Sequence, residues 1–107
     1  MRQLQQGDVL LMQVDSLPVG GISAALSPRN GRYILADGES TGHAHAVPAI
    51  AGVLLFQFQK DMFLKTDVEI QITHEEHQPV MVDPGIWRVG RVVEVDPFEN
   101  EIRQIMD

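Results

Sequence analysis

All four histidines of the chain fall in two short windows, and histidine is the side chain best suited to metal binding and to acid–base chemistry near neutral pH. The window Thr-Gly-His-Ala-His-Ala holds His43 and His45, and the window Thr-His-Glu-Glu-His holds His74 and His77. A generic β domain requires no such clustering. We therefore predict one shared site in which all four histidines are candidate metal ligands.

The two pairs differ in spacing and so need different local structures to converge. Alternate residues of a strand project from the same face, so His43 and His45 would lie side by side. Residues three apart lie on opposite faces of a strand. His74 and His77 therefore converge only if residues 75–76 form a turn or a short helical segment.

Composition limits the metal chemistry that is possible. The chain has no cysteine, which excludes disulfides and thiolate ligands and leaves imidazole and carboxylate as the strong ligand types. Such a set suits a divalent metal ion, with Zn²⁺, Mn²⁺, Fe²⁺ and Ni²⁺ as candidates. Side chains that could orient the imidazoles from a second layer are Glu39, Thr41, Glu75 and Glu76. The Gly-Glu-Ser-Thr-Gly segment that contains two of them is equally typical of a plain turn.

Three functional interpretations of the cluster stay open at this point. With three protein ligands, an open position would accept water or substrate, as in a metal-dependent hydrolase or isomerase-like enzyme or a binder of a small polar molecule. Without a metal, facing histidines could act as general acid and general base. As exposed loops, the same segments would serve a non-catalytic protein-interaction or phage-derived assembly module. Either pair alone is also typical of a solvated strand edge or polar turn.

Charge and hydropathy limit the classes of binding partner and the cellular location that we expect. The chain has 15 acidic and 8 basic residues, a net charge of −7, and no basic stripe to neutralise phosphates. We therefore expect no nucleic-acid or membrane partner. The most apolar segment, residues 44–56, is interrupted by His45, Pro48 and Gly52, and the N-terminal segment lacks the apolar stretch of a signal peptide. These features predict a cytoplasmic protein.

Short strands are the elements expected to position the histidines. Residues 68–73 alternate most clearly, with Val68, Ile70 and Ile72 on one face, and extending the pattern places His74 on that apolar face. Other predicted strands span residues 8–14, 32–36, 43–47, 53–59, 62–65, 80–82 and 86–95. Asn30-Gly31 is typical of a hairpin turn, and residues 83–85, Asp-Pro-Gly, predict a type II turn that closes a hairpin between the last two strands.

These elements predict an all-β fold in a single domain covering residues 1–107. About eight short antiparallel strands with turn signals between them are typical of a small barrel or sandwich with little helix. Asp8 and Trp87 are interpreted as a turn residue and a core residue. Residues 20–29 give no clear assignment, and residues 97–107 are compatible with either a helix or an edge strand.

Four segments together resemble small bacterial and phage-associated proteins of unassigned function. They are Gln-Gly-Asp-Val-Leu-Leu at 6–11, Gly-Glu-Ser-Thr-Gly-His-Ala-His-Ala at 38–46, His-Glu-Glu-His at 74–77 and Pro-Gly-Ile-Trp at 84–87. This resemblance covers nearly the whole chain and implies no particular activity.

A looser similarity links the chain to cupins, whose first motif carries His-x-His after a Gly-rich turn. His43 and His45 match that pair, but no Glu follows His45 at the usual short interval. The cupin similarity therefore implies only a metal site held within a β-barrel.

Overall fold

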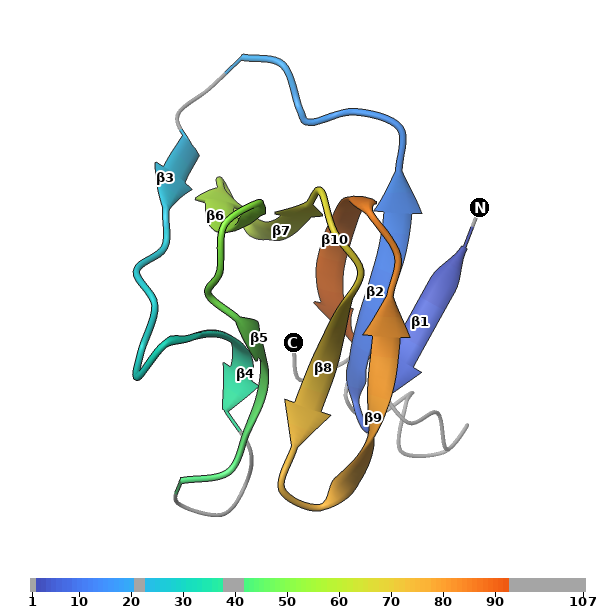
Figure 1. Cartoon of the computed structure of the whole chain (residues 1–107). Coiled ribbons are helices and arrows are strands. Elements are labelled where there is room, and N and C mark those ends of the chain that lie inside the picture. Colours follow the sequence, from blue (N-terminus) through green and yellow to red (C-terminus); the bar gives the residue numbers. More distant parts are fainter. Residues whose placement is uncertain (1, 21–22, 38–41, 93–107) are drawn as a thin grey trace, which may run out of the picture.

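The computed structural model describes residues 2–20, 23–37 and 42–92, and this part of the chain forms ten β-strands and no helix (Figure 1). The strands are β1 (Gln3–Gln6), β2 (Val9–Val14), β3 (Ser23–Ala25), β4 (Arg32–Asp37), β5 (Ala44–Pro48), β6 (Val53–Phe58), β7 (Asp61–Thr66), β8 (Ile70–His74), β9 (His77–Val82) and β10 (Gly85–Arg91). Among these residues there is accordingly no helix that could span a membrane.

Two antiparallel sheets divide the strands between them. One has six strands in the order β1-β2-β10-β7-β6-β3, and the other has four in the order β4-β5-β8-β9. The all-β sandwich expected from the sequence is confirmed. The barrel alternative is wrong for the described residues, because the strands form two separate sheets and neither sheet closes on itself. Two short strands, β1 and β3, bring the number above the expected eight, since neither has a recognisable apolar alternation.

Both sheets contribute to one apolar core. Trp87 on β10 is fully buried, as expected for a core residue, and its indole N–H donates to the Asp83 carbonyl at 3.0 Å. Ile70 and Ile72 on β8 are buried while Gln71 between them is exposed, which confirms the predicted alternation for these residues. Val68, predicted on the same face, is exposed because the strand begins only at Ile70. Other buried side chains of this core include Val9, Leu11, Leu35, Val47, Val53, Leu55, Leu64 and Val82.

The hairpin predicted around Asp83-Pro84-Gly85 does not form. β9 pairs with β8, whereas β10 pairs with β2 and β7, so the connection crosses from one sheet to the other. Gly85 has φ of +152°, far from the value near +80° of a type II turn. The Pro-Gly pair correctly marks a change of chain direction, but local turn chemistry does not select the strand with which the chain then pairs.

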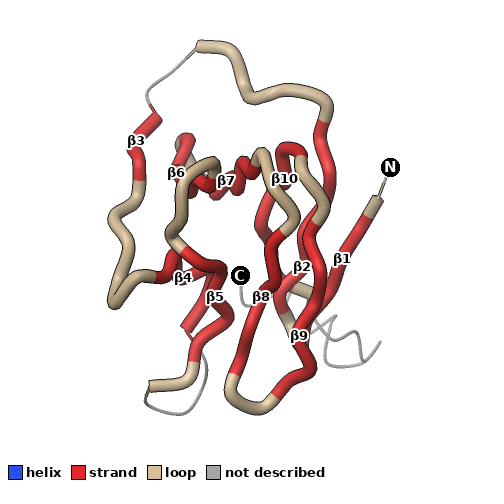
Figure 2. Tube along the Cα trace, in the orientation of Figure 1, coloured by secondary structure: helices blue, strands red, loops and turns tan. Residues whose placement is uncertain are grey.

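Other turns do form hairpins, and two of these lie at the site. Asn30-Gly31 forms the predicted hairpin, with φ of +54° and +76° as a type I′ turn requires. A second hairpin joins β1 to β2 through Gly7-Asp8, and a third joins β8 to β9 through residues 75–76. Figure 2 shows this third turn and the chain entering β5 at the same end of the four-stranded sheet. The ambiguous tail, residues 97–107, and the end of the predicted strand 86–95 lie outside the described residues.

Candidate metal centre

Three of the four histidines converge, from segments far apart in the sequence. His45, His74 and His77 each offer a ring nitrogen, and these atoms lie within 4.8 Å of one another. The ring centroids are 4.3 Å apart for His45 and His74, 4.7 Å for His74 and His77, and 5.5 Å for His45 and His77. β5 supplies the first ring, and the two ends of the β8–β9 turn supply the others. The structure therefore brings together one member of the first pair and both members of the second.

His43 lies beside this group and not within it. It precedes the first residue of β5, and its ring meets that of His74 edge-on at a centroid distance of 6.0 Å. His43 Nδ1 is 3.3 Å from Glu76 Oε1. This nitrogen is shielded from solvent, but it forms no hydrogen bond with any described residue. The proposed role of His43 as a ligand thus stays a prediction, with the geometry favouring the other three.

The β8–β9 turn brings its two histidines together. His74 and His77 face each other across the ladder after a register irregularity, and the two glutamates between them form the turn. The Glu76 backbone N–H donates to His74 Nδ1 at 3.0 Å. Glu75 Oε1 accepts the backbone N–H of Ala44 at 2.8 Å, and this hydrogen bond lowers the pKa of the Glu75 carboxyl. Glu75 thereby fastens the turn to the start of β5.

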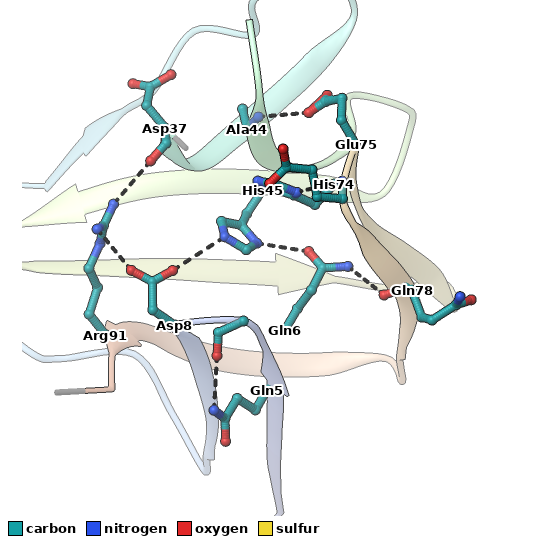
Figure 3. A network of polar contacts seen from close by, with 12 residues as sticks. Gln5, Gln6, Asp8, Asp37, Ala44, His45, His74, Glu75, Gln78 and Arg91 are labelled. Atoms are coloured by element: carbon teal, nitrogen blue, oxygen red, sulfur yellow. Dashed lines mark hydrogen bonds and ion pairs between the residues drawn. The ribbon is translucent and has the colours of Figure 1, made fainter. Parts of the chain in front are cut away.

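His45 is held by Gln6, a residue that the sequence did not single out. Gln6 is buried, and its Nε2 donates to the carbonyls of Ile72 and Gln78, both at 2.9 Å. Because carbonyls only accept, the amide must direct Oε1 toward His45 Nδ1, 2.9 Å away (Figure 3). His45 Nδ1 therefore carries a hydrogen, and Nε2 of the neutral ring keeps its lone pair.

Several groups set the charge of His45, whose side chain is almost completely buried. Burial lowers its pKa most, and the neighbouring His74 lowers it further. Asp8 opposes them, with Oδ1 3.3 Å from His45 Nε2 and Oδ2 3.1 Å from Arg91 Nη1. The net shift is downward from 6.5, so the ring is predominantly neutral at pH 7, as a metal ligand must be.

Gly7 makes room for the imidazoles at the β1–β2 turn. A Cβ added there would lie 2.7 Å from His77 Nε2 and 3.2 Å from His45 Cε1. The residue has φ of +55° and is the first of a two-residue hairpin loop, as in a type II′ turn, where glycine is favoured. Glycine thus serves both the backbone conformation and the close approach of two rings.

Of the four residues predicted to support the histidines from a second layer, the structure describes two. Glu75 and Glu76 both contact the histidine segments, whereas Glu39 and Thr41 lie outside the described residues. Gln6, the last residue of β1, and the turn residues Gly7 and Asp8 were missed as site residues. The Gly-Asp pair signalled a turn, but nothing in the sequence indicated that this turn packs against the histidines.

Comparison with known proteins yields a family and no activity. Residues 5–92 match the family model described as "Domain of unknown function (DUF8820)". No curated protein and no solved structure is significantly similar to the chain. The matched region spans all three segments of the site, namely the β1–β2 turn, the start of β5 and the β8–β9 turn.

Proposed function

The chain belongs to the DUF8820 family, and we propose that it is a metal-binding protein whose ligands include His45, His74 and His77. The observation that carries this proposal is the approach of three ring nitrogens to within 4.8 Å of one another. Metal–nitrogen bonds of about 2.0–2.1 Å in a tetrahedral site place imidazole centroids about 5 Å apart. The observed centroid distances of 4.3, 4.7 and 5.5 Å bracket that value.

The orientation of His45 supports the proposal. Metal-binding histidines commonly donate the other ring N–H to an oxygen acceptor, which fixes the tautomer and directs the lone pair at the metal. Gln6 Oε1 is such an acceptor, 2.9 Å from His45 Nδ1. Because Gln6 is itself anchored by two backbone carbonyls, the ring is oriented before any ion arrives.

One hydrogen bond competes with metal binding. The Glu76 N–H occupies the lone pair of His74 Nδ1, so the neutral ring carries its hydrogen on Nε2. Ligation by His74 requires the ring to turn and this bond to break. The net loss is about 1 kcal/mol for a solvent-accessible hydrogen bond, compared with about 10–16 kcal/mol of apparent binding free energy at structural zinc sites. The competition therefore lowers the affinity without preventing binding.

The donor set favours borderline metals. Neutral imidazole suits Zn²⁺ and Ni²⁺, and general affinity trends place Mn²⁺ and Fe²⁺ below them for the same ligands. The net charge of −7 attracts cations of any type and so adds affinity but no selectivity. Zn²⁺ is the first ion to test.

The experiment uses tag-free protein, stripped with a chelator, in a calorimetric titration with Zn²⁺. Wild type is expected to bind one ion per chain. His77 is exposed, so His77→Ala should leave the fold intact and weaken binding at least about tenfold. Its exposed neighbour supplies the control Gln78→Ala, which should bind like wild type because Gln78 contributes only a backbone carbonyl. No Zn²⁺ binding by wild type, or equal binding by His77→Ala, would refute the proposal.

A further inference from the structure

We infer that Asp8 is the fourth ligand of this centre and that the bound ion joins the two sheets. This inference rests on the proposed function, since it assigns one more ligand to the same ion. Asp8 lies at the β1–β2 turn, with its carboxylate between the His45 and Arg91 side chains (Figure 3).

The distance between Asp8 and His45 is the first argument. In a tetrahedral zinc site, metal–ligand bonds of about 2.0–2.2 Å place adjacent ligand atoms about 3.4 Å apart. Asp8 Oδ1 and His45 Nε2 are 3.3 Å apart, which matches one edge of such a tetrahedron. The carboxylate would therefore need little movement to share an ion with His45. Asp8 does not lie within 4.8 Å of all three ring nitrogens, so His74 or His77 would have to move toward it to complete the site.

Chemical character is the second argument. His45 Nδ1 carries the hydrogen that bonds to Gln6, so Nε2 of the neutral ring presents a lone pair. The Asp8 carboxylate presents another, and two acceptors that face each other at 3.3 Å need a cation or a proton between them. A metal ion satisfies both atoms at once.

Asp8 is also held in place independently of His45. Its backbone carbonyl accepts the Val92 N–H at 2.8 Å, and Oδ2 is 3.1 Å from Arg91 Nη1. Arg91 therefore engages one carboxylate oxygen and leaves Oδ1 for the ion. This arrangement favours a carboxylate that binds through a single oxygen and is oriented by an arginine behind it.

The sheets on which the ligands lie determine what the ion would do. The three histidines come from β5, β8 and β9 of the four-stranded sheet, whereas Asp8 belongs to the β1–β2 turn of the six-stranded sheet. An ion held by the histidines alone would stabilise one sheet only. With Asp8 as a ligand, the ion links both sheets beside the hydrogen bonds of Gln6. A site closed by four protein ligands suits a structural or metal-responsive role, while an open position is typical of catalytic sites.

The test compares wild type with Asp8→Ala and Arg91→Gln, each loaded with Co²⁺ or Zn²⁺. Arg91→Gln is the comparison variant, because it removes the arginine that orients the carboxylate but keeps the carboxylate itself; it should weaken Zn²⁺ binding by about tenfold and leave the coordination unchanged. Wild type and Arg91→Gln should both show the intense visible bands of tetrahedral Co²⁺ with no dependence on pH in the range where the complex is stable. Asp8→Ala should bind Zn²⁺ at least about 100-fold more weakly, because losing a ligand costs at least as much as the roughly 10–100-fold that loss of a supporting group causes. Its Co²⁺ spectrum should change with pH as solvent fills the vacant position.

Amide hydrogen exchange supplies a readout of the link between sheets. Zn²⁺ should slow exchange across residues 3–14 in wild type and in Arg91→Gln, but not in Asp8→Ala. If wild type binds no metal, the proposed function fails and this inference with it. If wild type and Asp8→Ala bind Zn²⁺ equally and protect residues 3–14 equally, only the assignment of Asp8 fails. Equal losses in Asp8→Ala and Arg91→Gln would show that the ion pair, and not ligation, is responsible.

Discussion

Replacing Gly7 by alanine tests whether the β1–β2 turn shapes the histidine cluster. The new Cβ would lie 2.7 Å from His77 Nε2, closer than Cβ atoms approach other atoms in proteins, and 3.0 Å from His77 Cε1, which is also a tight contact. His77 is exposed and so free to swing away, which relieves the clash but removes a ligand from the cluster. Gly7→Ala is therefore expected to impair metal binding more than folding.

The stability cost follows from the backbone. An alanine at φ of +55° is strained by about 1–2 kcal/mol, and the less flexible unfolded chain returns about 0.4–1 kcal/mol. The free energy of unfolding should therefore fall by about 1 kcal/mol, which corresponds to a decrease in Tm of about 4–8 °C in a domain of this size. Gly31→Ala is the matched control, because Gly31 has φ of +76° and no atom within 4 Å of an added Cβ.

Thermal unfolding with and without Zn²⁺ separates the two effects. Both variants should melt below wild type when metal-free. Zn²⁺ should raise the Tm of wild type and Gly31→Ala alike, whereas Gly7→Ala should lose most of that increase through an affinity at least about tenfold lower. An undiminished increase in Gly7→Ala, or an equal loss in Gly31→Ala, would refute the reasoning.

Two further predictions concern the buried network in the metal-free protein. Gln6→Leu keeps the approximate shape of the side chain but removes the donor to two backbone carbonyls and the acceptor for His45 Nδ1. Two of these hydrogen bonds, to the Ile72 carbonyl and to His45, are buried. At about 1–3 kcal/mol for each, the free energy of unfolding in urea should fall by at least about 2 kcal/mol, and a loss below about 1 kcal/mol would contradict the assigned network. The second prediction is that stability falls on acidification, because the pKa of His45 lies below 6.5 in the folded chain. Above 6.5 the ring is neutral in both states; as the pH falls from there toward the folded-state pKa, only the unfolded chain takes up the proton, so this contribution is progressively lost. Urea unfolding between about pH 7.5 and pH 5.5 should show this decline, and its slope should be smaller in His45→Gln; an unchanged slope would show that another group is responsible.

Local pattern was sufficient for much of the fold. The two-residue period of β8 predicted which isoleucines are buried, because alternate side chains of a strand face opposite sides. Asn30-Gly31 predicted its hairpin, since both residues adopt positive φ at little cost. These features depend on neighbours in the chain, and so the sequence alone determines them.

Which strands pair, and which side of each strand faces the core, depended on the whole molecule. In β6 the run Val53-Leu54-Leu55 is apolar on both faces, and only the packing of the sheets shows that Leu54 is 53% exposed while its neighbours are buried. The hairpin predicted at Asp83-Pro84-Gly85 was wrong for a related reason. This turn reverses the chain, but whether the following strand joins the same sheet depends on which apolar face that strand must cover.

The candidate site shows the same division. The pairing of all four histidines is evident in the sequence, and a turn at residues 75–76 was enough to bring His74 and His77 together. Only the tertiary structure selected His45 over His43 as their companion, because β5 begins at Ala44 and leaves His43 outside the strand. Only the tertiary structure shows that Gln6 and Asp8 contact His45. Side-chain contacts between two sheets leave no periodic pattern in the sequence.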